Sequence, residues 1–108
     1  MNWLVDLLKS PSSFQSDPWG YVRNQMGHAY IVGGGLALLG VPLWLIFAGY
    51  LAWEATQYFA FRAELWDNFD DIAHVMLIAV AAQFRIPELL LCHALFVAAG
   101  FFCRRPAA

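Results

Sequence analysis

Residues 24–53 read NQMGHAYIVGGGLALLGVPLWLIFAGYLAW, and this stretch decides the predicted fold. It contains no Asp, Glu, Lys or Arg. As one continuous helix, the apolar pattern over residues 18–61 would be about 65 Å long, twice the roughly 30 Å hydrocarbon core of a bilayer. The segment must therefore reverse. Gly40 suits a helix end and Pro42 a helix start, so we expect a tight helical hairpin.

The composition favours a membrane protein. Of 108 residues, 61% are hydrophobic and 13% are charged, whereas soluble domains average about 45–50% and about 25%. A small soluble domain leaves much of its area exposed and could not hide so much apolar surface. The net charge of −2 gives no basic surface for nucleic acid. We therefore expect membrane lipids, and no nucleic acid, as partners.

The predicted fold class is all-α: a polytopic membrane bundle of four transmembrane helices. Asp17 and Pro18 signal the start of the first helix, and Asp67 or Asn68 is expected to cap the third. The expected spans are 18–40, 42–62, 68–84 and 87–103, within a single transmembrane domain over residues 17–105.

Residues 1–16 are expected to form a short amphipathic segment in the membrane interface. The sequence also leaves open a topology of three spans. In that alternative, residues 28–50 cross once and residues 51–71 lie on the cytoplasmic surface.

The distribution of positive charge predicts the orientation. With four spans, both termini share one side, and Arg85 is the single cation expected on the other. An excess of Lys and Arg marks the cytoplasmic side. We therefore expect a multi-pass protein of the bacterial inner membrane with both termini in the cytoplasm. The cytoplasmic side would carry Lys9, Arg23, Arg62, Arg104 and Arg105, with an aromatic belt of Trp19, Tyr21 and Trp66.

A group of polar residues within the apolar segments calls for a partner or a role, because polar side chains in a membrane are costly. His28 precedes Gly40 by as many residues as Glu54 follows Pro42, so both should lie about 18 Å from the turn. Three helices would bring polar groups to one depth, while His93 is expected to stand apart. The candidate ligand-binding residues are Asn24, His28, Glu54, Gln57, Arg62, Asp70 and His74.

Several chemistries fit this cluster. The residues could form hydrogen bonds that only hold helices together, or recognise a polar lipid headgroup with Arg62 at its phosphate. They could form a switch in which His and Glu share a proton. A metal site is a further candidate, since imidazole and carboxylate are ordinary ligands, but the spacing is not diagnostic. Its ligands would be His28, Glu54, Asp70 and His74. No catalytic residue or cofactor is assigned.

The polar residues also resemble a family pattern. Three short motifs resemble, in order, those of the VanZ-like membrane proteins. They are Asn24-Gln-Met-Gly-His28, Glu54-Ala-Thr-Gln57 followed by Arg62, and Asp70-Asp71-Ile-Ala-His74. Asn24 stands where the family tends to have Asp, and His74 where it tends to have Asn. The resemblance covers about residues 24–80 and implies a bacterial or phage envelope protein, with links to glycopeptide resistance of the teicoplanin type.

Three functions are compatible with these features. The first is a VanZ-like protein whose buried polar pocket binds a lipid-linked or cell-envelope ligand. The second is a pore-forming lysis protein of the phage holin type. The third is an accessory subunit of a larger membrane complex or a homo-oligomer. None of the three requires an enzyme.

Overall fold

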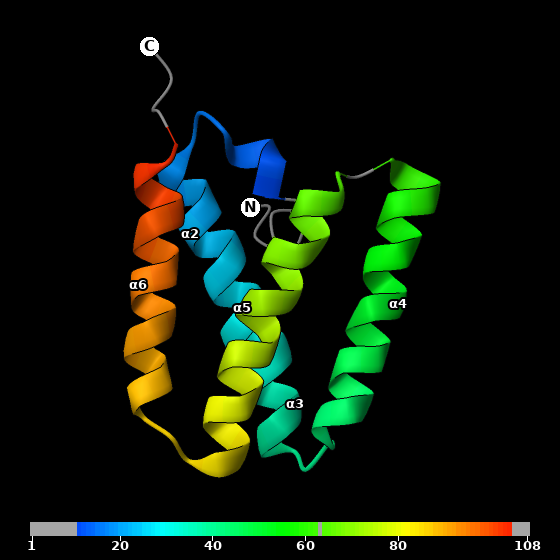
Figure 1. The fold of residues 1–108 in the computed structure, drawn as a ribbon, viewed down its shortest axis with the longest axis vertical. Coiled ribbons are helices and arrows are strands. Elements are labelled where there is room, and N and C mark those ends of the chain that lie inside the picture. Colours follow the sequence, from blue (N-terminus) through cyan, green and yellow to red (C-terminus); the bar gives the residue numbers. More distant parts are fainter. Residues whose placement is uncertain (1–10, 63, 105–108) are drawn as a thin grey trace.

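The computed structural model describes residues 11–62 and 64–104, which are almost entirely helical (Figure 1). A short 3-10 helix, η1 (Pro11–Phe14), precedes the first helical run. That run consists of α2 (Pro18–Met26), a π-helix η2 (Gly27–Gly34) and α3 (Gly35–Leu38). The remaining helices are α4 (Leu43–Phe61), α5 (Leu65–Phe84) and α6 (Glu88–Phe102).

Local signals in the sequence explain the helix ends. The Asp17 carboxylate accepts a hydrogen bond from the Gly20 backbone N–H at 2.9 Å, with Pro18 at the first helical position. Gly40 has φ +90° in the turn before α4, a conformation that favours glycine. The predicted first reversal is therefore confirmed. The expected cap at Asp67 or Asn68 is wrong, because α5 already begins at Leu65 and both side chains are buried instead.

The prediction of four transmembrane helices is wrong. Within residues 11–62 and 64–104, the structure contains no helix with both the length and the apolar character that a membrane crossing needs. At 1.5 Å per residue, α6 is about 22 Å long, short of a hydrocarbon core of about 30 Å. Helix α5 carries three carboxylates in its first two turns, and α4 carries Glu54 and Gln57 in its second half.

The predictions that depended on those spans are corrected with them. These are the multi-pass topology, the location in a bacterial inner membrane with both termini in the cytoplasm, and the cell-envelope setting, none of which the helices support. The proposed interfacial aromatic belt is also wrong, because it depended on those membrane spans. Tyr21 is 1% exposed and faces the interior, whereas Trp19 and Trp66 point outward. Residues 1–10 of the expected interfacial segment lie outside the described residues.

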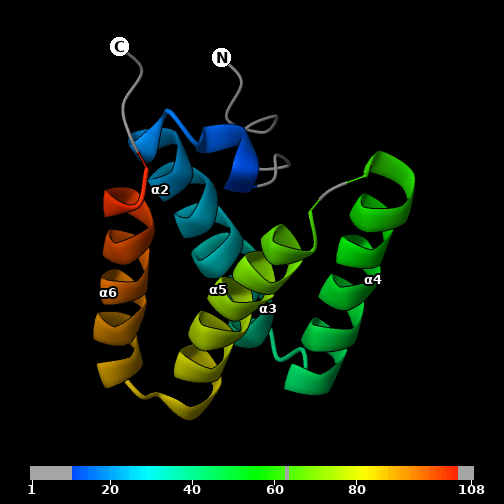
Figure 2. The ribbon, with the colours of Figure 1, turned by 45° about the horizontal axis from the view of Figure 1, so that its top comes forward.

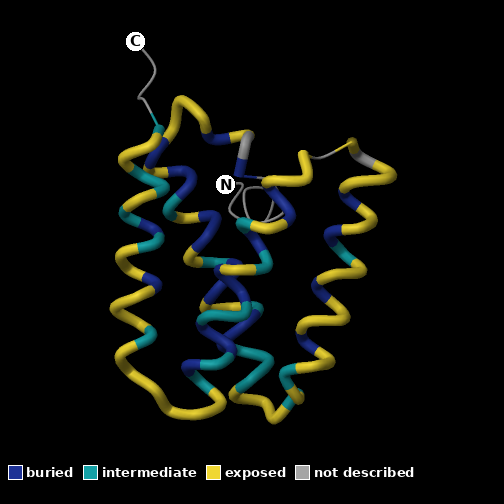
Figure 3. The backbone as a smooth tube through the Cα atoms, viewed as in Figure 1, coloured by how far each residue is buried: buried dark blue, intermediate teal, exposed yellow. Residues whose placement is uncertain are grey.

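Helix α5 lies at the centre of the molecule, against the π-helix, α4 and α6 (Figures 1 and 2). The core joins Ile46 and Tyr50 of α4 to Val75 and Ala79 of α5. The radius of gyration is 13.5 Å, close to the roughly 13 Å expected for a compact chain of about 100 residues. Helix α4 contributes one narrow buried stripe, and most of its remaining surface is exposed (Figure 3).

The π-helix places the polar residues of the first helical run against α5. Its hydrogen bonds run from i to i+5, so residues five apart share a face. His28 and Gly33 are such a pair, and both are buried. A methyl group at Gly33 would overlap the Val75 backbone carbonyl. The two helices therefore approach too closely there for any larger residue, and this fixes His28 beside α5.

Candidate functional site

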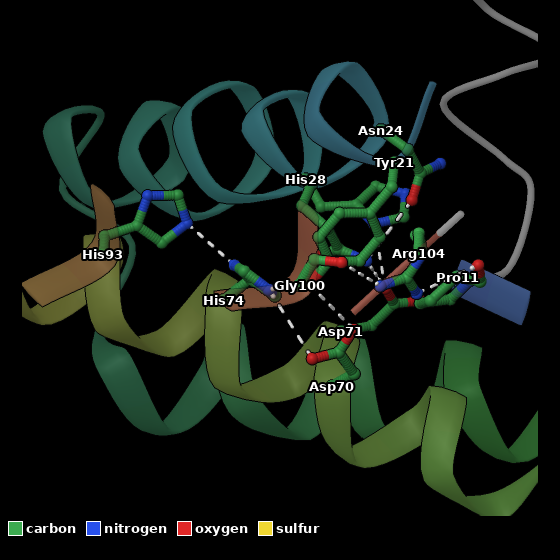
Figure 4. Close-up of polar contacts among 11 residues, drawn as sticks. Pro11, Tyr21, Asn24, His28, Asp70, Asp71, His74, His93, Gly100 and Arg104 are labelled. Carbon is green, nitrogen blue, oxygen red and sulfur yellow. Dashed lines mark hydrogen bonds and ion pairs between the residues drawn. The ribbon is translucent and has the colours of Figure 1, made fainter. Parts of the chain in front are cut away.

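Buried polar side chains from α2, the π-helix, α4, α5 and α6 meet in the interior, and Figure 4 shows several of those from α2, the π-helix, α5 and α6. They form two groups. The imidazole chain consists of Tyr21, Asp70, His74 and His93. The carboxyl cluster consists of Gln25, His28, Glu54 and Asp71, and it lies beside Tyr50.

The imidazole chain runs from α2 through α5 to α6. The Tyr21 hydroxyl donates to Asp70 Oδ2 at 3.3 Å and lies 3.1 Å from His74 Nε2. On the other side of the ring, His74 Nδ1 lies 2.8 Å from His93 Nε2. The His74 ring stacks on Phe96, with ring centroids 4.1 Å apart. Every polar atom of His74 therefore has a protein partner.

The tautomers of His74 and His93 can be assigned by starting from His93, at the inner end of the imidazole chain. Burial, followed by the nearby His74, lowers the pKa of His93 to about 4, so His93 is neutral near pH 7. Its Nδ1 has no hydrogen-bond partner, and a bare acceptor costs less than a bare N–H donor. We therefore assign the proton to His93 Nε2, which donates to His74 Nδ1. His74 Nε2 then carries the proton that faces Tyr21 and Asp70.

Arg104 closes the outer end of this chain. Its guanidinium carbon lies 3.5 Å from the centre of the Tyr21 ring, and it donates to the carbonyl oxygens of Gly100 and Pro11. A cation over an aromatic face stabilises the contact by about 0.5–2 kcal/mol. The contact ties the end of α6 to α2 and covers Tyr21.

Asp71 is the centre of the carboxyl cluster. Its Oδ1 accepts from Gln25 Nε2 at 2.8 Å and lies 3.2 Å from His28 Nδ1. Its Oδ2 has no hydrogen-bond partner, although Asp71 is fully buried. An unpaired carboxylate oxygen in the interior is costly. The cluster is thus incomplete on the side that faces α4.

Glu54 faces that incomplete side from α4. It is 1% exposed, and neither carboxyl oxygen has a hydrogen-bond partner of good geometry. Burial raises the pKa of Glu54 to about 9, with the charge of Asp71, a hydrogen bond with Asp71 and the charge of Asp67 adding to the effect. At neutral pH, Glu54 therefore keeps its proton beside Asp71. Two neighbouring carboxyls that hold one proton are the consequence of like charge at short range.

An apolar groove of about 460 Å³ opens next to the carboxyl cluster, between the two arms of the first helical hairpin. Its polar end is formed by His28 and Tyr50, whose rings are 6.1 Å apart between centroids. Tyr50 is 8% exposed, and its hydroxyl has no partner. We call this the hairpin groove; it is lined by His28, Val32, Leu36, Val41, Leu45, Ile46, Gly49, Tyr50 and Trp53.

A second groove, of about 470 Å³, lies on the other face of the first helical run, against α5 and α6. Tyr30, Ala82, Arg85 and Leu90 are among its lining residues. Neither Glu54 nor Asp71 lines either groove, but His28, which lies 3.2 Å from Asp71, lines the hairpin groove and not the second one. The hairpin groove is therefore the better candidate site.

The structure does not bring all the predicted site residues together. His28 and Glu54 meet in the carboxyl cluster, while Asp70 and His74 belong to the imidazole chain. Asn24 is buried and accepts a hydrogen bond from Gln25 Nε2 at 3.4 Å. Gln57 is buried on α4. Arg62 is exposed and ends α4 in a left-handed conformation, φ 55°.

Sequence reasoning missed several members of the site. His93 was expected to stand apart, but it is hydrogen-bonded to His74, so that prediction is wrong. Asp71 was not among the candidate ligand-binding residues, but it is the centre of the carboxyl cluster. A signal for Asp71 did exist, because Asp67, Asp71, His74 and Ile78 follow the four-three-four spacing of one helix face. Tyr50 and Glu54 share a face of α4 in the same way.

The metal hypothesis gains no support from the geometry. Across the described ranges 11–62 and 64–104, no three His, Cys, Asp or Glu residues are arranged to hold a metal ion. His28 and Glu54 belong to a different hydrogen-bonded group from Asp70 and His74, so the four candidate ligands do not converge on one point.

No protein-family model, curated protein or solved structure matches this chain. The resemblance to the VanZ-like proteins therefore stays a prediction.

Proposed function

We propose that this protein binds a small, mainly apolar ligand in the hairpin groove, with a polar head of the ligand at His28 and Tyr50. The observation that carries the proposal is the unpaired Tyr50 hydroxyl at the end of an otherwise apolar groove. Ligand sites typically combine a largely apolar lining with a few polar groups that fix orientation.

The groove has the dimensions of a ligand site. Its volume of about 460 Å³ falls within the roughly 300–1,000 Å³ typical of small-molecule pockets. Aliphatic side chains from both arms of the hairpin form its walls, while Gly49 leaves its floor open, with no atom within 4 Å of where a Cβ would stand.

The polar end of the groove supports a role beyond helix packing. A cluster that served only to join helices would satisfy its members, because a buried polar atom without a partner costs about 1–3 kcal/mol. Of the unpaired buried atoms in the described residues, the largest group lies in and beside the carboxyl cluster: the Tyr50 hydroxyl, Gln25 Oε1, both Glu54 oxygens and Asp71 Oδ2. The others belong to Gln57, Asn68, His93 and Arg104. A ligand head hydrogen-bonded to Tyr50 would remove part of that cost.

This site also refines the predicted ligand. A lipid-linked phosphate would need a cation beside the pocket, and Arg62 was expected to supply it. Arg62 is instead exposed at the end of α4, while the buried end of the groove holds two acids. The geometry therefore supports an apolar ligand with a head that is not a phosphate. The holin-type hypothesis loses its basis together with the membrane spans.

The proposal is tested by titrating the protein with N-phenyl-1-naphthylamine, an uncharged apolar dye whose fluorescence rises in an apolar environment. We expect saturable binding to one site. Gly49→Phe fills the hairpin groove and should weaken binding by about tenfold or more, since one lost apolar contact group is worth 1–3 kcal/mol.

Two matched variants control this experiment. Ala48→Phe adds the same ring to the neighbouring position of α4, which does not line the groove, and Ala82→Phe fills the second groove. Both should bind the dye like the parent protein. If Gly49→Phe binds equally well, or if Ala82→Phe alone removes binding, the hairpin groove is not the site.

A further inference from the structure

We infer that the ligand of the hairpin groove is a lipophilic cation, and that its binding releases a proton from the Glu54–Asp71 pair. This inference rests on the proposed function and specifies the ligand class. Three independent features support it: the balance of charge at the polar end, the aromatic walls beside it, and the single proton held between the two carboxyls.

The first feature is an excess of acid around Glu54. Asp71 and Asp67 of α5 act on Glu54 by their charge, and Tyr50 lies one turn away on α4. From the π-helix, His28 faces the same place through its contact with Asp71. Of the described arginines, none forms an ion pair with Glu54 or Asp71; Arg23 pairs with Asp17, and Arg104 covers Tyr21.

The consequence is a preference for positive charge. An anionic head at Tyr50 would meet the negative charge of Asp71 in a buried setting, where like charges repel strongly. A neutral head would gain only hydrogen bonds. A cationic head gains the attraction of the carboxyl pair, with which none of the described arginines forms an ion pair.

The second feature is the pair of aromatic residues beside the polar end. Tyr50 and Trp53 both line the hairpin groove, three residues apart on α4. Aromatic faces attract cations through the ring quadrupole, Trp most strongly, and quaternary ammonium groups are recognised in this way. The remaining walls are aliphatic and suit an apolar body. Together they describe a cation with bulky apolar substituents.

The third feature couples binding to a proton. Glu54 holds a proton at neutral pH because burial and Asp71 raise its pKa to about 9. A positive charge at Tyr50 favours the ionised carboxyl and lowers that pKa. When the cation binds, the O–H bond of Glu54 breaks, the proton passes to bulk water, and the resulting carboxylate faces the bound cation. No bond forms to the ligand.

The experiment compares three probes of one shape: benzyltrimethylammonium, its uncharged isostere neopentylbenzene, and the anion phenylmethanesulfonate. Near pH 8, we expect the cation to bind at least about tenfold more tightly than the isostere and the anion not to bind measurably. Calorimetry in two buffers of different ionisation enthalpy should show release of up to about one proton per bound cation near pH 7.

The affinity for the cation should also depend on pH. Below the Glu54 pKa of about 9, release of one proton makes binding tighter by up to about tenfold per pH unit. Glu54→Gln should remove this dependence and the proton release. Glu88→Gln, which removes one exposed carboxyl from α6, matches the change in net charge and should behave like the parent protein.

The outcomes separate the two proposals. If neopentylbenzene binds and Gly49→Phe blocks it, but the cation gains no affinity or releases no proton, the cation inference is overturned and the apolar site stands. If the dye binds but none of the three probes does, the cation inference fails alone; if the dye does not bind either, both proposals fail. Should Glu54→Gln not fold, the pH dependence of cation binding to the parent protein decides the question. If Gly49→Phe changes the oligomeric state instead, a second copy of the chain occupies the groove and the inference is wrong.

Discussion

Two polar groups of similar composition pack against α5, and they differ in completeness. In the imidazole chain, His74 has partners on both ring nitrogens and an aromatic ring against its face. In the carboxyl cluster, Glu54 and one oxygen of Asp71 have no partner of good geometry, and the neighbouring Tyr50 hydroxyl has none either. The first group is closed around His74 and leaves His93 Nδ1 unpaired at its inner end, whereas the second is open toward a groove.

The difference shows that buried polar residues alone do not identify a site. Both groups contain acids and histidines at helical spacing, and both are nearly inaccessible to solvent. The carboxyl cluster combines several unpaired atoms with the adjacent hairpin groove, whereas the imidazole chain has one unpaired atom, His93 Nδ1. A satisfied network adds rigidity and joins elements, whereas unsatisfied groups call for an explanation. The imidazole chain therefore stabilises the fold, and the carboxyl cluster is the candidate for binding.

The largest expected effect concerns Glu54 and pH. In the unfolded chain, Glu54 ionises above its ordinary pKa of 4.5, whereas in the folded protein it keeps its proton up to about pH 9. The folded protein therefore becomes less stable as the pH rises through this window. The free energy of unfolding falls by at most about 6 kcal/mol, at about 1.36 kcal/mol for each unit of difference between the folded and unfolded pKa values. Glu54→Gln cannot ionise and should escape this loss.

This effect is measured by urea unfolding of the parent protein and of Glu54→Gln between pH 5 and pH 9. The variant should become progressively more stable relative to the parent protein as the pH rises. Glu88→Gln controls for the loss of one negative charge. A stability difference that is independent of pH would show that Glu54 is not held as the neutral acid.

Much of the helical framework could be predicted from the sequence, because its signals are local. The cap at Asp17, the reversal at Gly40 to Pro42 and the second turn after Phe84 all depend on residues within a few positions of each other. The membrane assignment failed because it rested on average composition. The same apolar residues are divided among helices that are short, interrupted by the π-helix, or marked by buried acids.

The site could be predicted only in part, for a related reason. Helical spacing brought His28 and Glu54 into one hypothesis, since each lies at the same distance from the reversal. Spacing along a helix does not say which of two neighbours points inward, so Asp70 was preferred to Asp71. The contact of His93 with His74 joins α5 to α6, and a depth estimate that assumed a bilayer placed His93 elsewhere.

The second expected effect compares a histidine from each group. His74→Ala removes contacts with Tyr21, His93 and Phe96 and leaves a donor on His93 unpaired. A loss of about 4 kcal/mol is expected from the cavity together with the unpaired group. His28→Ala should cost less, about 1–2 kcal/mol, because Asp71 keeps its bond to Gln25 and the adjacent groove admits water.

Both variants are measured by urea unfolding at one pH, with circular dichroism to show that the helices remain. The ranking is the decisive result. Equal losses, or a larger loss for His28→Ala, would contradict the distinction between a closed and an open group.

The smallest of the three effects tests the inner end of the imidazole chain. His93 is fully buried, and burial followed by His74 lowers its pKa to about 4 from 6.5. As the pH falls below 6.5, His93 becomes protonated in the unfolded chain but stays neutral in the folded protein. The free energy of unfolding therefore falls until about pH 4. The loss is at most about 3 kcal/mol. His93→Gln keeps a donor for His74 but does not titrate, so it should lack this acid-dependent loss.

Proton NMR of the His93 ring gives a direct check, because a titration midpoint near 6.5 would mean that water reaches this ring and that the chain is not closed.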